Sequence, residues 1–497
     1  MAVGALFALC VAPTFISYQP YQFTWDDTDY LLRAIAVNRA FWSGDVHGLG
    51  AAMVSWHTPA MTLLGLPWGP MAARDAAGNC FFTLAAVIAF LASICLYMLL
   101  RVGVKPIFLV LASICVGASL GPYQLGEQAK HMHDLATRFL SDNLLAWTAL
   151  AGVLLVPFEA RTPPPSARRA VVRGILCASI CSFGALTKVS FFYFVVLIVP
   201  LVLFIRYRDS GIRSASAWLI AFVCCSAPTA IYFFRYGRAA LAQARTGSFG
   251  SVAEIFYVPL RQFLGDIIVG SPGLVLSLVL LAIASIYLVV KKRPGLFDTD
   301  VLALLIMIGF LVVLLAAPAK QSRYLFPAIV ALPFLTAILI SNKEDSVPVS
   351  PAALAAGLVF LGLLVAAAPT RHRPYQQSLT RAEAVVTQAA RCGAKSILLA
   401  SDSRTLNVFL VNLVSELSGS TVSVDTLAYQ AMRGVPIQDD FRFLSESDMV
   451  VFQDARNTQP QVTNQRASEY EQYIRQRESV PIRVGSDVAV YSMHCSP

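Results

Sequence analysis

Charged residues are scarce in this chain. Asp, Glu, Lys and Arg make up only 13% of the 497 residues, about half the share found in ordinary soluble domains, while 57% of the residues are hydrophobic. A soluble protein of this composition would expose too much apolar surface, so the mean hydropathy of +0.64 predicts a membrane protein. The scarcity is uneven, because long stretches before residue 370 lack ionisable groups and the remainder has near-normal polarity. We therefore expect two parts that lie in different solvents.

Several patterns typical of other protein classes are missing. No CxxC pair or Cys/His spacing indicates zinc, and no GxGxxG follows an expected strand to indicate a nucleotide site. His131 and His133 lie near Asp134, but two residues spaced in this way do not share a helix face, so we expect no metal site. The net charge of +9 could suggest nucleic acid. However, the Lys and Arg residues form short clusters between apolar runs, as membrane topology places them, so we expect no nucleic-acid partner.

Apolar stretches long enough to cross a bilayer recur through residues 1–368. Residues 1–17 have no basic lead and no small-x-small cleavage site before Tyr18, so we expect a span there and not a signal peptide. The stretch 171–205 is too long for one helix, and Lys188 interrupts it, so we expect two short spans with Lys188 at the turn. About eleven spans are predicted, at 1–18, 79–100, 106–122, 141–158, 171–187, 189–205, 215–234, 272–290, 301–317, 324–340 and 351–368.

The basic residues predict the orientation. With the first terminus in the cytoplasm, every inside loop carries at least one Lys or Arg, in agreement with the positive-inside rule. These loops contain Arg101 and Lys105; Arg161, Arg168, Arg169 and Arg173; Arg206, Arg208 and Arg213; Lys291, Lys292 and Arg293; and Lys343. The outside then holds 19–78, 123–140, 235–271 and 369–497. The loop 235–271 is itself basic, which indicates either a tolerated long loop or a surface for an anionic head group or acceptor.

Residues 369–497 are expected to form a soluble α/β domain outside the membrane. Helices are predicted at 380–392 and 405–418, and strands at Ser396–Ala400, Met449–Phe452 and Val488–Tyr491. In an oxidising compartment Cys392 and Cys495 could form a disulfide, or both could remain thiols. The predicted fold class is thus a polytopic α-helical membrane protein with a C-terminal soluble α/β domain.

Ionisable residues gather at the predicted outer ends of the spans, where they are costly and therefore indicate function. Three carboxylates stand within Trp25-Asp26-Asp27-Thr28-Asp29-Tyr30, just beyond the first span. The others are His57, Arg138, Asp142, Lys188, Lys320 and Arg323, with Tyr324 next to the last of them. Carboxylates and separated cations in one outward cavity would suit a lipid phosphate head group. A nearby carboxylate could take a proton from an attacking hydroxyl or amine, and the cations would stabilise a departing phosphate.

Five short motifs occur before the C-terminal part of the chain. They are Asp26-Asp27-Thr28-Asp29-Tyr30, His57-Thr58-Pro59-Ala60, Ser141-Asp142, Gly184-Ala185-Leu186-Thr187-Lys188 and Arg323-Tyr324-Leu325-Phe326-Pro327. In these motifs and their order, the chain resembles the GT-C superfamily of polyprenyl-phosphate-sugar glycosyltransferases, in particular the branch of protein O-mannosyltransferases and lipid A aminoarabinose transferases. In the second motif Thr58 stands where the family has the first proline of a His-Pro-Pro-like element.

The resemblance implies a role for each matched residue. Asp26 would be the general base and Asp27 would position the sugar or the base. Lys188 and Arg323 would bind the lipid-linked phosphate, and Tyr324 would line its path. Asp142 would order the pocket, with Arg138 as a possible partner, while His57 and Lys320 are further substrate-binding candidates. The resemblance also implies a GT-C-like fold, a single displacement with inversion, and no obligatory metal or cofactor.

The sequence therefore predicts a glycosyltransferase in a bacterial inner membrane whose site and C-terminal domain face the periplasm. Its partners would be the polyprenyl-phosphate-sugar lipid, membrane lipids, and an acceptor that is a glycan, a lipid or a protein. The main alternative is a transporter or flippase, although such proteins place charges near the bilayer midplane and contain internal repeats, and no repeat is visible here. A non-catalytic scaffold with an outward receptor domain is a third hypothesis.

Overall fold

The computed structural model describes most of the chain. The described residues are 25–53, 58–70, 73–120, 141–162, 166–249, 259–287, 298–316, 322–341, 373–403, 406–428, 430–431, 434–453, 464–477, 481–484 and 488–493. The chain folds into two compact units, each assembled from segments that are separated in the sequence. The helical unit comprises 1–17, 46–67 and 78–369, and the mixed unit comprises 18–45, 68–77 and 370–497.

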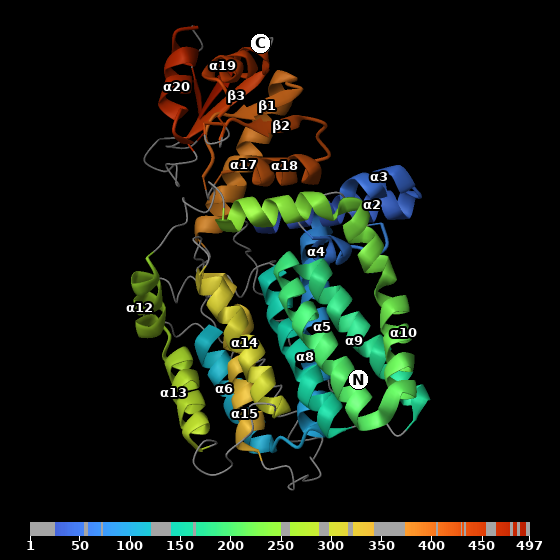
Figure 1. Cartoon of the computed structure of the whole chain (residues 1–497). Coiled ribbons are helices and arrows are strands. Elements are labelled where there is room, and N and C mark those ends of the chain that lie inside the picture. Colours follow the sequence, from blue (N-terminus) through green and yellow to red (C-terminus); the bar gives the residue numbers. More distant parts are fainter. Residues whose placement is uncertain are drawn as a thin grey trace. The chain divides into compact units, whose positions relative to one another are not determined.

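The helical unit is built from long apolar helices that pack side by side (Figure 1). Among the described residues, six helices are long and apolar enough to cross a membrane, or seven if the bent pair Leu260–Ile268 and Gly273–Ile286 forms one span. The predicted spans 1–18 and 351–368 lie outside the described residues. The helices are α3 (Val46–Met53), α4 (Ala60–Leu63), α5 (Ala73–Arg101), α6 (Pro106–Leu120), α8 (Ser141–Arg161), α9 (Ala167–Thr187), α10 (Phe192–Phe249), α12 (Leu260–Gly270), α13 (Pro272–Tyr287), α14 (Thr299–Ala316) and α15 (Phe326–Ile340), with 3₁₀ turns η1 (Val189–Phe191) and η3 (Ser322–Leu325).

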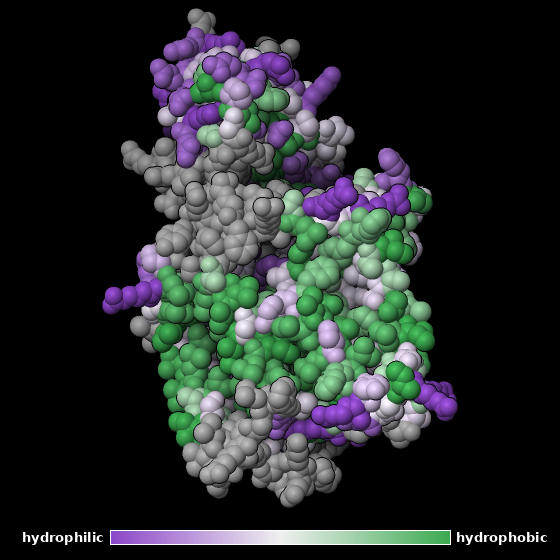
Figure 2. Space-filling model, in the orientation of Figure 1, coloured by the Kyte–Doolittle hydropathy of each residue, from purple (hydrophilic) through white to green (hydrophobic). Residues whose placement is uncertain are grey.

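Helix α8 is central to this unit. It packs against α9, α10, α14 and α15, and 18 of its 21 residues are buried. The outer helices instead expose large apolar side chains, for example Phe90, Phe204 and Phe234. Figure 2 shows that hydrophobic residues cover the visible flank of the helical unit. A helix that is apolar all round belongs in a core or a lipid bilayer, so these exposed side chains are suited to contact with lipid.

The helical backbone is interrupted twice between the start of α9 and the end of α10. Helix α9 ends at Thr187, and Lys188 has an extended backbone (φ −159°, ψ 137°), as the interruption of the apolar run at this lysine predicted. Gly211 then breaks α10 at φ 74° and ψ 175°, a conformation that only glycine adopts readily. The predicted span 189–205 lies in the part of α10 before Gly211, and the predicted span 215–234 lies in the part after it. That second part continues as a helix to Phe249, so the start of the predicted outer loop 235–271 is helical instead.

Ion pairs lie near the last turn of α8. Glu159, which is almost completely buried, pairs with Arg206 and accepts a hydrogen bond from Arg173 at 3.2 Å. Arg161 pairs with Asp300 at the start of α14 and also donates to the Val102 carbonyl oxygen at 2.5 Å. Asp142 lies in the first turn of the same helix, and no charged residue occurs between positions 143 and 158. Helix α8 thus carries charge only at its two ends.

The mixed unit contains a five-stranded sheet of order β2-β1-β3-β5-β4. The strands β1, β2 and β3 are parallel, and β5 and β4 continue the sheet antiparallel, with Leu398 opposite Val450 and Val450 opposite Tyr491. The elements are α2 (Trp25–Ser43), α17 (Arg373–Cys392), β1 (Ser396–Leu399), α18 (Val408–Leu417), β2 (Ser423–Thr426), α19 (Ile437–Glu446), β3 (Met449–Gln453), α20 (Ala467–Arg475), β4 (Ile482–Val484) and β5 (Val488–Ser492).

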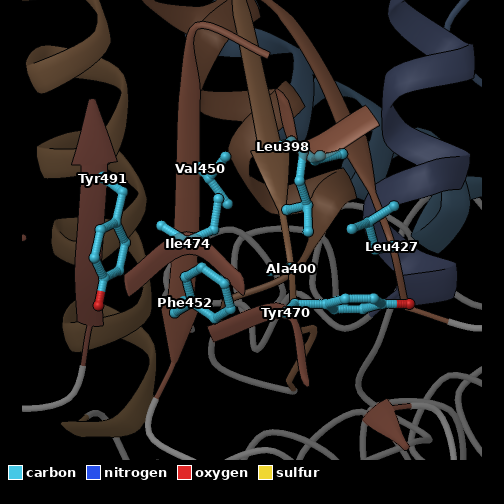
Figure 3. Packing of buried hydrophobic residues seen from close by; sticks show 9 residues of the cluster. Leu398, Ala400, Leu427, Val450, Phe452, Tyr470, Ile474 and Tyr491 are labelled. Carbon is cyan, nitrogen blue, oxygen red and sulfur yellow. The ribbon is translucent and has the colours of Figure 1, made fainter. Parts of the chain in front are cut away.

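The core of this sheet is apolar and aromatic. Phe452 and Tyr491 meet edge to face at 5.4 Å between ring centroids, and Tyr470 and Ile474 from α20 complete the cluster (Figure 3). Asp440 on α19 is fully buried and accepts hydrogen bonds from Arg466 at 2.7 Å and from the Tyr470 hydroxyl at 2.6 Å. Burial, together with the Asp440 carboxylate, raises the pKa of the Tyr470 phenol above its ordinary value.

The three predicted strands are β1, β3 and β5, while β2 and β4 were not predicted. The Cys392 Sγ atom lies 3.3 Å from the Ser492 Oγ atom. Cys495 lies outside the described residues, so its pairing with Cys392 stays a prediction.

Candidate functional site

Asp142 is the centre of the candidate site in the helical unit. It stands in the first turn of α8, where the unpaired backbone N–H groups of a helix favour a negative charge. Its side chain is only 2% exposed. A carboxylate this deeply buried requires compensating cations, and two of them come from distant parts of the chain.

Lys188 supplies the first cation. Its Nζ atom forms an ion pair with Asp142 Oδ1, and 28% of its side chain is exposed. Gly184 fixes the local geometry, because a Cβ atom at this position would overlap the Phe191 ring. The chain can therefore turn tightly after α9 and present Lys188 from an extended segment, with the Lys188 N–H donating to the Gly184 carbonyl oxygen.

Arg323 supplies the second cation from η3. Its Nε atom lies 3.7 Å from Asp142 Oδ2, and 17% of its side chain is exposed. The neighbouring Tyr324 ring lies beside both cations, 4.8 Å from Lys188 Nζ and 5.8 Å from Arg323 Cζ, measured to the ring centroid. Both distances fall within the range of cation–π attraction. Four of the predicted site residues, from three separate elements, are thus brought together.

The two cations of this cluster differ from the carboxylate in exposure. Lys188 and Arg323 are partly exposed, whereas the Asp142 carboxylate between them is buried. An arginine and a lysine that reach solvent can hold a phosphate, the arginine by its planar fork and the lysine as a point charge.

Thr58 was not among the predicted site residues, yet it contacts the residue that precedes Lys188. Its Oγ1 atom donates a buried hydrogen bond of 2.6 Å to the carbonyl oxygen of Thr187, the residue before Lys188. The family that the motifs resemble has a proline at this position, and a proline side chain could not donate such a bond. The threonine therefore links the segment that begins at residue 58 to the turn at Lys188 by a hydrogen bond.

For the remaining predicted site residues, the structure does not describe the side chains. Asp26 and Asp27 lie in the first turn of α2, but only their backbone is described. Asp29, the third acid, is buried and accepts a hydrogen bond of 2.9 Å from Arg33 Nε. His57, Arg138 and Lys320 lie outside the described residues, as do His131 and His133. Within the described residues, no three His, Cys, Asp or Glu side chains are grouped so that they could hold a metal ion.

Comparisons with known proteins show the fold. No family model matches the chain, and no curated protein matches it by sequence. Solved structures are similar over nearly the whole length, among them two structures of one protein. They are ArnT from Cupriavidus metallidurans bound to undecaprenyl phosphate, with a TM-score of 0.54 and 12% identity over 99% of both chains, and the same protein in the apo state, with 0.52 and 14% over 99% of this chain and 98% of that one.

ArnT is a GT-C glycosyltransferase, so the resemblance inferred from the motifs is confirmed at the level of the fold. The apolar helices and this shared fold identify the chain as an integral membrane protein.

Proposed function

We propose that this chain is an inverting glycosyltransferase that moves a sugar from a polyprenyl-phosphate donor to an acceptor at the outer face of a bacterial inner membrane. The observation that carries the proposal is the cluster of Lys188 and Arg323 on buried Asp142, with Tyr324 alongside. The shared fold supports it, since one structure with that fold holds undecaprenyl phosphate. The eleven-span topology and the extracytoplasmic position of residues 369–497 are parts of the same proposal.

In the proposed reaction, the donor phosphate binds to Lys188 and Arg323, and Asp142 holds both cations in place. Charge-assisted hydrogen bonds of this kind are the strong ones in proteins. Tyr324 borders the path of the lipid and shields the cations from water on one side. Asp142 would hold both cations in position before the donor arrives, so little reorganisation would be needed when charge develops on the phosphate.

The chemistry is a single displacement. An acceptor hydroxyl or amine attacks the anomeric carbon, and the Asp26 carboxylate takes the proton of the attacking group. The bond between the anomeric carbon and the phosphate oxygen breaks, and the polyprenyl phosphate leaves with the electron pair and a negative charge that the two cations stabilise. Asp27 positions the sugar or the base, and His57, Arg138 and Lys320 are further candidates for binding the substrates. No obligatory metal or cofactor is part of this proposal.

The test uses the full chain purified in detergent and a donor set of synthetic undecaprenyl phosphates, each carrying either a neutral hexose or an amino sugar. Release of undecaprenyl phosphate in the presence of an envelope glycolipid extract measures transfer. We expect Asp26→Asn to bind undecaprenyl phosphate normally but to lose transfer by at least about a hundredfold, because a general base contributes roughly that much or more. Asp45→Asn, in the same outer loop, is the matched control and should retain full activity.

Normal transfer by Asp26→Asn would show that the base is another residue. Movement of the donor lipid across the bilayer of liposomes reconstituted with the purified chain, without cleavage, would instead support the transporter hypothesis.

A further inference from the structure

The acidic helix α2 belongs to the same compact unit as the C-terminal α/β domain, although more than 300 residues separate them in sequence. Helix α2 packs directly against α18. Within the same unit, the buried Asn38 side chain donates hydrogen bonds to the carbonyl oxygens of Trp68 at 3.1 Å and Gly69 at 3.2 Å. The helix is therefore held both by the backbone of its own loop and by a helix of the C-terminal domain.

Helix α18 has the composition of a helix that is covered on more than one side. Its sequence Val-Phe-Leu-Val-Asn-Leu-Val-Ser-Glu-Leu has a single charged residue, Glu416. One side packs on α17 and on β2, where Asn412 donates to the Val424 carbonyl oxygen at 3.4 Å. A surface helix of a soluble domain needs only one apolar stripe, so the additional apolar residues are explained by the packing of α2.

An ion pair marks the interface between the two helices. Arg39 on α2 donates to Glu416 on α18 at 2.5 Å. The two side chains are 50% and 43% exposed, so they can be replaced without opening the core. This is a long-range connection, since 377 residues separate its partners in the sequence.

Helix α2 can transmit a displacement from this interface to the acidic motif. Its 19 residues include no glycine or proline, so nothing in the sequence favours a kink. Asp26 and Arg39 are separated by thirteen residues, or about 20 Å of helix. A tilt of about 3° at the Arg39 end would therefore move the backbone of Asp26 by about 1 Å, an error that can reduce the rate of a positioned reaction substantially.

We propose that the C-terminal α/β domain positions the acidic motif through α18, and that Arg39 and Glu416 are positioning residues for Asp26. This inference rests on the proposed function, because it takes Asp26 to be the general base. It gives the C-terminal domain a role in the catalytic step itself and not in capturing the acceptor alone. The donor phosphate, in contrast, binds residues of the helical unit, so its affinity should not depend on this interface.

The test is a charge-reversal cycle on the full chain. Glu416→Arg and Arg39→Glu each place like charges in contact, and the double variant restores an ion pair of opposite polarity. Glu446→Arg is the matched control, because Glu446 forms an exposed pair with Arg442 at 3.4 Å within α19 of the same domain. For each variant, kcat and KM are measured with the best member of the donor set, together with binding of undecaprenyl phosphate and the thermal unfolding midpoint.

We expect each single reversal to lower kcat by about fivefold, which is the rate equivalent of the upper end of the energies typical of exposed ion pairs, because each variant also places like charges in contact. KM for the donor and undecaprenyl phosphate binding should stay within about twofold of wild type, the double variant should recover most of kcat, and Glu446→Arg should leave it unchanged.

Single variants with wild-type kcat, or a double variant no faster than the singles, would overturn the positioning role while leaving the glycosyltransferase proposal intact. A wild-type chain that transfers no sugar from any donor would overturn the proposed function and this inference together.

Discussion

Replacing Lys188 gives the sharpest test of the candidate site, because this residue has two separable roles. It neutralises a carboxylate that is 2% exposed, and it is proposed to bind the donor phosphate. Lys188→Met removes the charge and keeps most of the apolar stem. The structural role and the binding role then predict different results when Asp142 is changed as well.

The structural effect can be bounded from the contacts. Removing one partner of a fully buried ion pair costs about 3–5 kcal/mol. Lys188 is 28% exposed, and Arg323 still lies 3.7 Å from the Asp142 carboxylate, so the effect should be smaller. We expect Lys188→Met to lower the free energy of unfolding by about 2 kcal/mol. The double variant Lys188→Met/Asp142→Asn has no unpaired carboxylate and should recover much of that stability.

The binding effect should not recover. A hydrogen bond to a charged group contributes about 1.5–3 kcal/mol, so both the single and the double variant should bind undecaprenyl phosphate roughly ten- to a hundredfold more weakly. Asp142→Asn alone keeps both cations but loses the carboxylate that holds them in place, so it should weaken binding less than Lys188→Met does. Lys105→Met, at the predicted cytoplasmic side, is the control and should behave as wild type. Titration of each purified variant with undecaprenyl phosphate, beside thermal unfolding in detergent, provides both readouts.

If the double variant bound undecaprenyl phosphate within about twofold of wild type, Lys188 would be only the structural partner of Asp142. The phosphate site would then have to lie elsewhere in the helical unit.

Three further predictions concern residues around the site and in the C-terminal domain. Thr58→Val should lower the unfolding free energy by about 1–2 kcal/mol, because the buried Thr187 carbonyl loses its 2.6 Å hydrogen bond, and Thr58→Ser should restore it in a thermal unfolding assay. Gly184→Ala should destabilise by about 1–3 kcal/mol and weaken undecaprenyl phosphate binding, because the added Cβ would overlap the Phe191 ring; unchanged binding would contradict the stated geometry of the turn. Tyr470 should resist ionisation in an ultraviolet pH titration, because burial and Asp440 raise its pKa. The pKa of Tyr470 is higher in the folded than in the unfolded chain, where it is near 10, so the neutral phenol stabilises the folded state fully below about pH 10. This stabilisation is lost as the pH rises through the folded pKa, and Tyr470→Phe should remove this part of the pH dependence of the free energy of unfolding.

Part of the site was predictable because the cost of burying charge in an apolar run is visible in the sequence. Asp142, Lys188 and Arg323 each interrupt or begin an otherwise apolar stretch, and the structure brings them together. The break at Lys188 was predictable for the same reason. The hydrogen bond of Thr58 was not, because it joins residues 129 positions apart and depends on how two segments pack.

The sheet illustrates the same limit. Strand β3 is buried at all five positions and reads as an apolar run, so it was predicted. Strand β2 is the short edge strand Ser423–Thr426, with alternate residues exposed, and its polar sequence does not differ from that of a loop. The grouping of α2 with the C-terminal domain was also invisible, because local patterns do not reveal a contact between residues as distant as Arg39 and Glu416.

The two charged ends of α8 have a consequence for the lipid environment. Asp142 and Glu159 are seventeen residues apart, which corresponds to about 25 Å along a helix. Each end is tied by ion pairs to other helices, to Lys188 and Arg323 at one end and to Arg173 and Arg206 at the other. The helix therefore cannot tilt or slide freely to adapt to a bilayer of different thickness, as a single uncharged span can. The surrounding lipid must deform to meet the protein, and hydrophobic mismatch would be borne by the acyl chains.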